Sequence, residues 1–488
     1  MTAILRRNDP FACDKPREEC GVFGTFGTEE AAALTVLGLH ALQHRGQEAA
    51  GVITFDGRLF HSHRALGLVG DHFSSEAVVA GLPGHAAIGH VRYSTAGAPL
   101  LRNVQPLFAD FAFGGLALGH NGNLTNALTL RRRLVEQGCL FQSTSDTEVI
   151  VHLIARSRQP TVVERLVDAL CQVQGAFSLV ALSGSALFGV RDPLGVRPLV
   201  LGELDGATIL ASETCALDIM GARFVRDVEP GEVVIANAEG VESLRPFPKP
   251  PRRFCIFEYV YFSRPDSAVE GQNVYEVRKR IGAELAKESP APADMVIPVP
   301  DSGVPAAIGF AQAAGLPFEL GLIRNHYVGR TFIEPSDRIR HLGVKLKHNA
   351  NRATVVGRRV VLVDDSIVRG TTSTKIVAMI RSSGAAEVHM RIASPPTTHS
   401  CFYGVDTPER SQLLAAQNDL DAMARIIGVD SLAFLSLDGL YRAVGSARRD
   451  AGQPQYCDAC FSGDYPTLLE DLGYGREADQ LSLMLEDA

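Results

Sequence analysis

The pattern of apolar and polar residues divides the chain into two parts that predict different kinds of sheet. From residue 21 to about residue 240, short alternating runs such as 51–55, 86–91 and 177–182 are separated by glycine turns, and they predict strands. Strands mixed with helices in this way favour a layered α+β domain with antiparallel sheets. One helix is expected to begin near Ser145, because Ser145 and Glu148 have the spacing of a capping box.

The second part follows a proline-rich linker. Pro246, Pro248, Pro250 and Pro251 fall close together and form the best linker candidate in the chain. Beyond them, apolar runs alternate with helical stretches, which predicts an α/β domain with a mainly parallel sheet and crossover helices. The runs are 295–299, 360–363 and 432–435, and the clearest helical stretch is 373–383.

Composition and charge narrow the class of protein. The 488 residues suffice for two to four domains of roughly 100–200 residues. The net charge of -8 gives no global attraction to nucleic acid or to an anionic membrane, so neither is an expected partner. No apolar run approaches the roughly 18 residues that a membrane span needs.

The cysteines and the first residues of the chain bear on the cellular compartment of the protein, and the last residues form a separate segment. Nine cysteines, an odd number scattered along the sequence, make a poor disulfide framework and indicate a reducing, cytoplasmic environment. The first nineteen residues are too charged for a secretory signal. The acidic last twenty residues are expected to form a loosely held tail.

The segment 360–372 predicts a phosphate and metal site. A buried strand delivers Asp364 and Asp365 at its carboxyl end, a loop rich in glycine and threonine follows, and a helix then begins. The free N–H groups of a helix start favour phosphate, and Mg²⁺ commonly binds one or two carboxylates plus substrate oxygens. The alternative is a capped turn, which an Asp pair alone would allow.

This segment resembles the signature of type I phosphoribosyltransferases, which bind phosphoribosyl pyrophosphate (PRPP). The resemblance implies that Asp364 and Asp365 handle ribose and Mg²⁺, and that the loop beginning at Ser366 holds the 5′-phosphate through Arg369, Gly370, Thr371 and Thr372. It also implies a pyrophosphate loop at Asp301, Ser302 and Gly303, with Ser302 as a third metal-side ligand. The basic stretch 324–352 is then a closing lid rather than a solvated loop.

Cys20 is a candidate nucleophile, although most isolated cysteines are inert core residues. Cutting after Glu19 would make Cys20 the first residue, and its free α-amine, with a pKa of roughly 7.7–8, could then serve as the general base. A chain that still begins at Met1 would be a precursor. This arrangement resembles the N-terminal-nucleophile glutamine amidotransferases.

Three further strings support that resemblance and imply roles for their residues. The string 89–95 places Arg92 on the glutamine α-carboxylate, with Thr95 beside it, and Asp146 binds the α-ammonium. Asn121 and Gly122 supply the oxyanion donors. Read singly, each string also fits a turn or a helix cap.

Cys457 and Cys460 form a Cys-x-x-Cys motif, which can bind zinc or an iron–sulfur cluster, form a redox pair, or do none of these. The segments around them, Cys255 and Cys401 resemble the cluster-binding segments of one branch of the amidophosphoribosyltransferase family. That resemblance implies a [4Fe–4S] cluster on these four thiolates, in a structural or oxygen-sensing role.

Taken together, the motifs resemble the iron–sulfur-containing, leader-processed branch of the amidophosphoribosyltransferases. The resemblance implies a four-layer αββα Ntn-hydrolase glutaminase followed by a type I phosphoribosyltransferase domain. Ammonia from glutamine would convert PRPP into 5-phosphoribosylamine at the start of purine synthesis, in a homotetramer inhibited by purine nucleotides. The expected segments are a leader 1–19, a glutaminase domain 20–250, a transferase domain 251–467 and a tail 468–488.

Two rival interpretations each cover only one half of these motifs. A glucosamine-6-phosphate synthase-like amidotransferase would share the first half but would lack the segment 360–372. A non-enzymatic regulator on a phosphoribosyltransferase fold would have no use for Cys20 and Arg92.

Overall fold

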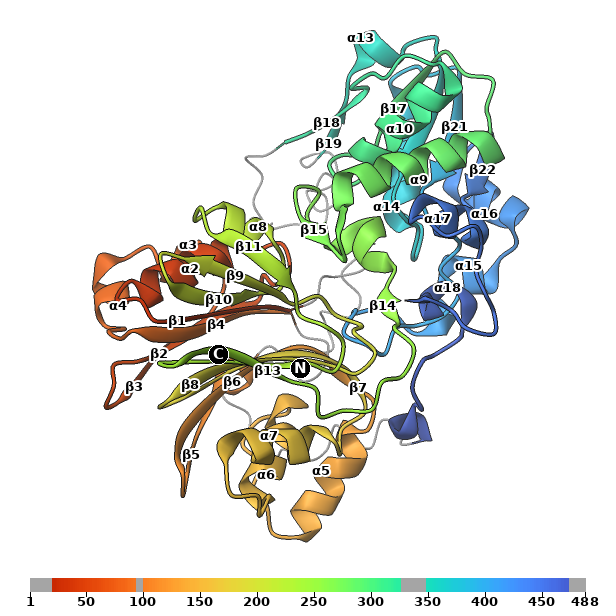
Figure 1. Ribbon diagram of the computed structural model, residues 1–488. Helices are drawn as coiled ribbons and strands as arrows, with labels where there is room; N and C mark the ends of the chain where they lie inside the picture. The colour runs from red at the N-terminus through yellow and green to blue at the C-terminus, as the bar shows by residue number, and fades with distance from the viewer. Residues whose placement is uncertain (1–19, 94–99, 326–347, 474–488) are drawn as a thin grey trace.

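The computed structural model describes residues 20–93, 100–325 and 348–473, and Figure 1 shows two sheet-containing regions. The first region holds two stacked antiparallel sheets. One has seven strands, in the order β11 (Arg223–Asp227), β9 (Val200–Leu204), β10 (Ala207–Ala211), β1 (Gly21–Phe26), β4 (Ala86–Arg92), β2 (Ala49–Phe55) and β3 (Phe60–Leu66). The other has six, in the order β13 (Gly240–Leu244), β12 (Val233–Asn237), β8 (Ala186–Arg191), β7 (Gly175–Ser183), β6 (Gly114–Leu124) and β5 (Leu107–Phe111).

Helices cover the outer face of each sheet, which makes four layers (Figure 1). Side-chain alternation explains the layering, because Val22 lies in the core between the sheets whereas Phe23 packs with the helix side of its own sheet. The first sheet is covered by α2 (Ala31–Ala41), α3 (Val69–His72), α4 (Glu76–Ala80) and α8 (Cys215–Asp218). The second is covered by α5 (Ala127–Glu136), α6 (Thr147–Arg156) and α7 (Val162–Leu170). The predicted αββα architecture is confirmed.

The start of α6 corrects one prediction. The helix begins at Thr147, and its N-cap, Asp146, makes no capping hydrogen bond with its side chain. The Glu148 carboxylate accepts hydrogen bonds from the backbone N–H groups of Gln142 and Ser143, both at 2.7 Å, instead of returning to Ser145. The predicted capping box is therefore wrong, because Glu148 stabilises the loop that precedes the helix.

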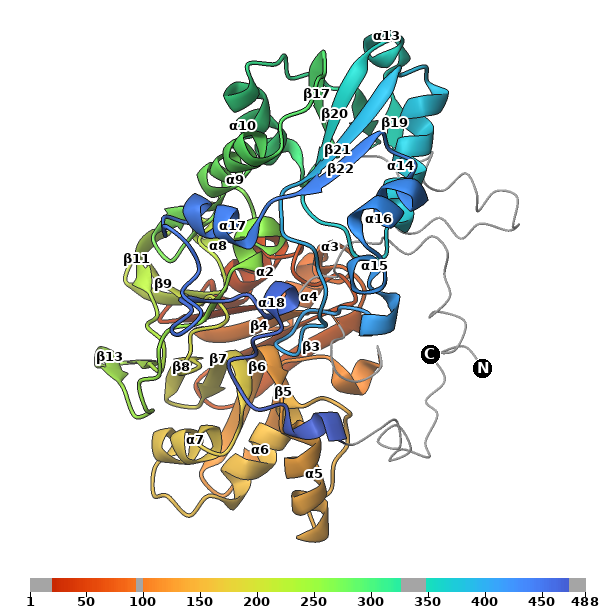
Figure 2. The ribbon, with the colours of Figure 1, turned by 90° about the vertical axis from the view of Figure 1, so that its right-hand side faces the viewer.

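The second region is built on a four-stranded parallel sheet, as predicted. Its strands are, in order, β17 (Met295–Pro298), β20 (Arg359–Asp364), β21 (Glu387–Ile392) and β22 (Ser431–Phe434). Figure 2 shows α9 (Val274–Glu288) and α10 (Val304–Ala314) on one face, and α14 (Thr371–Ser382) and α16 (Leu420–Ile427) on the other. Val361 and Val363 pack toward the first pair, whereas Val360 and Leu362 pack toward the second. Burial on both faces explains the continuous apolar runs.

Short elements join the two regions. The parallel pair of β14 (Phe254–Cys255) and β23 (Tyr456–Cys457) places Cys255 opposite Cys457, and the Cys255 N–H donates to Val196 O at 3.1 Å. Ala176 and Val196 share one hydrophobic core with residues of the second region, so the junction is packed. The remaining elements include η1 (Leu101–Asn103), η2 (Glu258–Phe262, a π-helix), β15 (Ala268–Val269), β16 (Gln272–Asn273), β18 (Leu322–Arg324), β19 (His348–Ala350), α13 (Arg352–Val355), η3 (Arg410–Gln412), α15 (Leu414–Gln417), α17 (Leu437–Ala443), α18 (Ala459–Ser462) and η4 (Glu470–Gly473).

The beginning of the acidic tail is bound, which differs from the loosely held tail expected from residue 468 onward. Asp471 accepts hydrogen bonds from the backbone N–H groups of Leu128 at 2.7 Å and Thr129 at 3.1 Å, in the first turn of α5. A carboxylate at a helix start satisfies free N–H groups and the helix dipole. Figure 2 shows this turn, η4, beside α5.

Candidate active sites

Cys20 lies buried at the start of β1. Its Sγ donates to Tyr93 O at 3.4 Å, and its own carbonyl accepts from Arg45 Nε at 3.3 Å. Burial raises the pKa of the Cys20 thiol to about 11, against the lowering effects of the Tyr93 hydrogen bond and the Arg92 charge. The thiol is therefore protonated at neutral pH, and it needs a base within reach in order to act as a nucleophile.

Charged groups of both signs surround that thiol. The charges of Arg92, Asp146 and Glu48 all act on Cys20, which places the three side chains close to it. Burial opposes ionisation of Asp146, but His120 and backbone hydrogen bonds, including one from Leu124 N at 3.0 Å, keep its pKa below the usual value. The cation can bind the α-carboxylate of an amino acid, and either carboxylate can bind its α-ammonium.

Glu48 is not among the residues predicted from the sequence. Glu48 lies just before β2. Its backbone N–H donates to Arg92 O at 3.1 Å, so the C-terminal end of β4 holds Glu48 beside the predicted site. A single carboxylate between alternating strand residues carries no recognisable motif. Thr95, the other predicted glutamine ligand, lies outside the described residues.

Asn121 is fully buried on β6, and among the described residues neither its Oδ1 nor its Nδ2 has a hydrogen-bond partner. An unsatisfied buried polar group costs about 1–3 kcal/mol, so this amide has a ready interaction to offer a ligand. The next residue, Gly122, has a φ of 142°, and a Cβ there would lie 2.0 Å from Ala176 O. Only glycine fits this position, and its conformation sets the direction of its N–H group.

His90 is not a base for Cys20 in this arrangement. Its Nε2–H donates to His120 O at 3.0 Å, and its Nδ1 has no partner among the described residues. Burial lowers the pKa of His90 to about 3, so the ring is neutral. The proton of Cys20 must therefore go to another group.

The two predicted PRPP loops lie at one edge of the parallel sheet. β17 and β20 are neighbours, with Pro298 opposite Val363, so the loops that follow these strands meet. In the first loop, Asp301 pairs with Arg324 at 2.5 Å. In the second, Asp364, Asp365 and Ser366 are all buried, and Ser366 Oγ donates to Asp365 Oδ1 at 2.6 Å. The fold thus brings Asp301, Ser302 and Gly303 together with Asp364, Asp365 and Ser366.

Helix α14 begins directly after the second loop. Its N-cap, Gly370, is left-handed with a φ of 81° and makes no side-chain capping hydrogen bond, and Thr371 and Thr372 form the first turn of the helix. A helix start of this kind binds phosphate. Arg369 donates to Gln412 Oε1 at 3.3 and 3.2 Å, which holds it beside the loop. Of the predicted lid, residues 326–347 lie outside the described residues.

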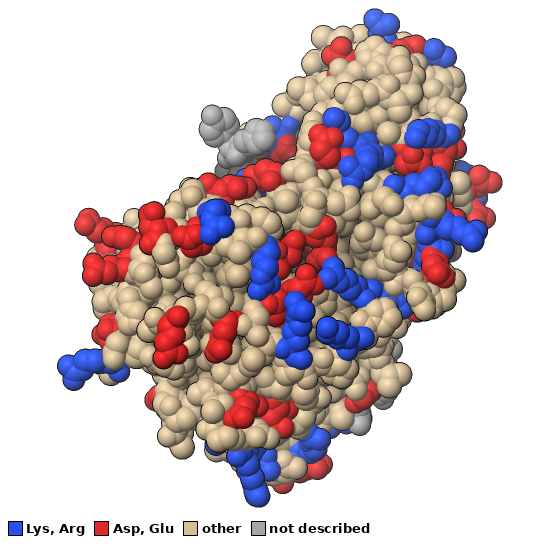
Figure 3. Space-filling model, in the orientation of Figure 1, with Lys and Arg blue, Asp and Glu red and all other residues tan. Residues whose placement is uncertain are grey.

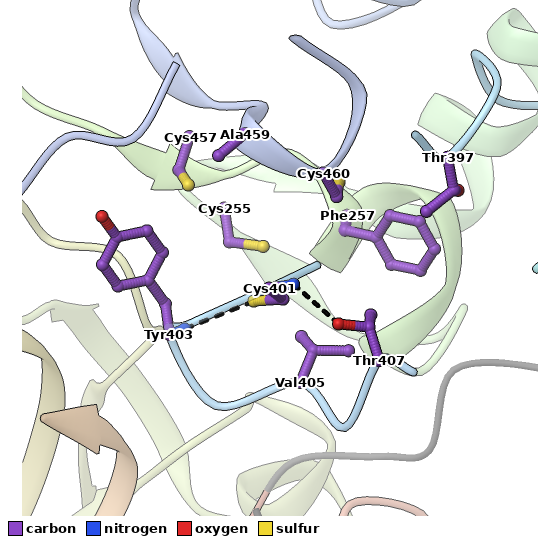
Figure 4. Close-up of a pocket in the computed structure, with 10 residues that line it drawn as sticks. All are labelled: Cys255, Phe257, Thr397, Cys401, Tyr403, Val405, Thr407, Cys457, Ala459 and Cys460. Carbon is purple, nitrogen blue, oxygen red and sulfur yellow. Dashed lines mark hydrogen bonds between the residues drawn. The ribbon is translucent and has the colours of Figure 1, made fainter. Parts of the chain in front are cut away.

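The four cysteines singled out in the sequence line one pocket (Figure 4). Cys255 comes from β14, Cys401 from the loop after β21, and Cys457 and Cys460 from β23 and α18. Burial raises the pKa of Cys255 to about 11 and raises the pKa values of Cys457 and Cys460 well above normal, with neighbouring thiols adding to the shift. None of the eight described cysteines forms a disulfide.

These thiols do not form a site for a single metal ion. Within residues 20–93, 100–325 and 348–473, no group of three or more His, Cys, Asp or Glu side chains could hold one. Zinc needs sulfurs at about 2.3 Å from one centre, whereas a cluster is held by thiolates that are farther apart. The pocket is lined by these four cysteines and otherwise mostly by apolar neighbours.

A buried polar network joins the two regions. Arg45 pairs with Glu213 at 2.5 Å and with Glu258 of the π-helix at 2.8 Å, and Arg197 reaches Glu258 at 3.3 Å. Arg278 donates hydrogen bonds to the carbonyls of Tyr259 and Ser263 in this π-helix segment, and the negative charge of Asp365 acts on its guanidinium group. This network was not predicted from the sequence, because its members are isolated charged residues far apart in the chain.

The folded chain also matches known proteins. Residues 90–218 match the family model of a glutamine amidotransferase domain. The amidophosphoribosyltransferase of Rhizobium etli is 58% identical over 98% of this chain and 97% of its own length. A glutamine PRPP amidotransferase from B. subtilis, solved in complex with ADP and GMP, has a TM-score of 0.87 and 48% identity, and covers 92% of this chain and 98% of its own.

The fold and these matches define a class II glutamine amidotransferase domain joined to a phosphoribosyltransferase-like domain. The chain belongs to the amidophosphoribosyltransferase family. The predictions that it is an enzyme, and that its reaction is the first step of purine biosynthesis, are confirmed. Across its described residues, no helix has the length and apolar character needed to cross a membrane.

Proposed function

We propose that the first region hydrolyses glutamine through Cys20. Arg92 binds the α-carboxylate with Thr95 beside it, and Asp146 binds the α-ammonium together with Glu48. Cys20 Sγ attacks the carboxamide carbon, and the resulting oxyanion accepts hydrogen bonds from Asn121 Nδ2 and the Gly122 N–H. Collapse gives a thioester and ammonia, and water then releases glutamate.

The observation that carries this proposal is the buried Asn121 amide, which has no partner among the described residues. Asn121→Ala is expected to lower kcat for glutamine hydrolysis by about 10²–10³ with little change in KM, because the amide bonds an oxyanion that exists only in the transition state. Steady-state assays with glutamine, compared with ammonium as the nitrogen source, measure this effect. Equal losses with both nitrogen sources would refute the assignment.

The base in this proposal is the α-amine of Cys20, freed when the leader 1–19 is removed. Support comes from burial, which raises the thiol pKa to about 11 and favours the protonated thiol, and from the neutral, hydrogen-bonded His90. Mass spectrometry of active enzyme is then expected to find Cys20 as the first residue.

In the second region, the start of α14 holds the 5′-phosphate of PRPP through Arg369, Gly370, Thr371 and Thr372. Asp364 and Asp365 orient the ribose hydroxyls, and Asp301, Ser302 and Gly303 face the pyrophosphate. The oxygen donors Ser302, Asp364 and Asp365 fit Mg²⁺, which would neutralise charge on the leaving pyrophosphate. Ammonia attacks C1 of the ribose and pyrophosphate departs, leaving 5-phosphoribosylamine.

Ammonia must pass between the regions without entering bulk water, where near neutral pH it would become ammonium and lose its nucleophilic lone pair. The packed junction, with Ala176 and Val196 in one core with transferase residues, is compatible with an enclosed path.

Cys255, Cys401, Cys457 and Cys460 would hold a [4Fe–4S] cluster. Their convergence in a mostly apolar pocket, with raised thiol pKa values, suits ligands that lose their protons only when metal binds. The proposed reaction has no redox step, so the role of the cluster would be structural, in that it ties three distant segments together. Iron and sulfide assays should each find about four atoms per chain.

The remaining features of the proposal concern domains and assembly. The glutaminase domain spans 20–250, the transferase domain 251–467, and the segment 468–488 follows it. The enzyme acts in a reducing, cytoplasmic compartment as a homotetramer, and purine nucleotides inhibit it. Support for nucleotide binding comes from the ADP and GMP in the similar B. subtilis structure. Charges of both signs are interspersed on the face shown in Figure 3.

A further inference from the structure

The loop that follows Cys401 in the transferase region touches the strand that carries the oxyanion donors. Asn123 Nδ2, on β6, donates a hydrogen bond to Phe402 O at 3.0 Å. A Cβ added to Gly404 would lie 3.1 Å from both the Cα and the carbonyl carbon of Gly122. The backbones of Gly404 and Gly122 are therefore in direct contact, although the two residues belong to different regions of the chain.

Gly122 is confined on its other side as well. In the sheet it lies opposite Phe177, and a Cβ on Gly122 would meet Ala176 O at 2.0 Å. The Gly122 peptide thus lies between the backbone of β7 and the backbone of Gly404. Its N–H direction depends on both neighbours.

The loop itself is rigidly held. Tyr403 O accepts two hydrogen bonds from the buried Arg197, at 2.9 Å from Nε and 2.7 Å from Nη2. The Cys401 N–H donates to Thr407 Oγ1 at 2.6 Å, and the Tyr403 N–H donates to Cys401 Sγ at 3.3 Å, as the dashed lines in Figure 4 show. These bonds fix Phe402 to Gly404 (402–404) between Arg197 and the cysteine pocket.

We infer that 402–404 is a positioning element for the oxyanion hole, so that the transferase region completes the glutaminase site. The inference rests on the proposed roles of Asn121 and Gly122. Oxyanion donors act only when they lie about 2.7–3.1 Å from the developing charge. A displacement of the Gly122 peptide by about 1 Å can cost 10²-fold in rate, because the donor then misses the oxyanion.

Gly404→Ala tests this inference. Gly404 has a φ of 111°, and a new Cβ would press on the Gly122 backbone. We expect kcat for glutamine hydrolysis to fall by about 10- to 100-fold with unchanged KM for glutamine, while ammonium-dependent synthesis and iron content stay at wild-type values. The matched control is Gly445→Ala, which has a similar φ of 96° but meets nothing within 4 Å. It is expected to leave both activities unchanged.

Asn123→Ala provides a second variant, which removes the hydrogen bond to Phe402 O together with a longer local one to Leu124 O at 3.4 Å. A failure of Gly404→Ala to fold therefore leaves the inference testable. It should lower the same kcat by about 10-fold or less, again with unchanged KM. Unchanged glutamine kcat in both variants, or equal losses with glutamine and ammonium, overturns the inference. Asn121→Ala, assayed in parallel, separates the two failures. If it alone lowers kcat, the positioning element is wrong and the oxyanion hole stands, and if it has no effect, the oxyanion assignment itself fails.

Discussion

The two active sites are assembled in opposite ways. The proposed glutaminase site collects single side chains from separate segments, with Cys20 directly before β1, Arg92 on β4 and Asn121 on β6. The proposed PRPP site consists of two continuous loops, 299–303 and 364–370, at the carboxyl ends of adjacent parallel strands. The first site acts through buried side chains whose charges perturb one another, whereas the second offers backbone N–H groups and a helix start.

This difference predicts different sensitivities to mutation. In the glutaminase site each side chain has one chemical task, and burial makes its removal severe. In the PRPP site several neighbouring groups share the charge of one substrate. The two sites also lie in separate regions of the chain. A mutation in one site should therefore impair the reaction of that site and leave the other reaction intact.

Cys20→Ala should show the largest effect and the cleanest separation. Removing the nucleophile should lower glutamine-dependent synthesis by about 10⁴-fold or more. Synthesis from ammonium should remain at the wild-type rate, because the transferase loops are untouched. Paired assays with the two nitrogen sources measure the separation, and an enzyme that is inactive with ammonium as well would argue for one shared site.

Asp365→Ala is the mirror experiment. Asp365 is buried at the sheet edge, where its carboxylate faces the expected ribose and Mg²⁺. Its loss should lower synthesis by about 10²–10³ with either nitrogen source, the range seen when one electrostatic contact to a transition state is removed. Glutamine hydrolysis measured without PRPP should be retained. A variant that loses activity only with glutamine would contradict the assignment of Asp365 to the PRPP site.

The same contrast explains what the sequence could predict. The strand and helix around Asp364 and Asp365 were predictable because the apolar strand, the two carboxylates, the glycine turn and the helix start are consecutive in the chain. The proposed glutaminase residues could be named only from short strings in a particular order, and Glu48, which belongs to no such string, was not among them. Residue type and local spacing cannot report long-range partners, so the contact between Gly404 and Gly122 could not be foreseen.

The capping box at Ser145 failed for a related reason. Ser145 and Glu148 have the spacing of the motif, but the Glu148 carboxylate instead accepts hydrogen bonds from two backbone N–H groups of the preceding loop. The same motif did form at α7, where Thr161 and Glu164 bond reciprocally. Tertiary contacts therefore determine which of two segments with the same motif spacing forms a capping box.

The smallest expected effect concerns the network that joins the two regions. Glu258 is fully buried between Arg45 and Arg197. Burial alone would raise the pKa of its carboxyl group, but the two guanidinium groups hold that pKa below its usual value. Glu258→Gln removes the carboxylate that Arg45 and Arg197 share, although Arg45 keeps its pair with Glu213. Loss of one buried charge from this network should destabilise the protein by about 3 kcal/mol. Because the network spans the junction, thermal unfolding should begin earlier and separate into two transitions.

Glu203→Gln is the matched control, since Glu203 pairs with Arg223 on the exposed surface of the first region. It should leave the melting curve unchanged, because exposed ion pairs contribute little. The pH dependence sharpens the test. A carboxylate with a lowered pKa stabilises the fold above its unfolded pKa, near 4.3, and this contribution is lost as the pH falls further. The difference between wild type and Glu258→Gln should therefore be largest near neutral pH and shrink on acidification. A difference that is constant with pH would show that packing, rather than charge, holds the junction together.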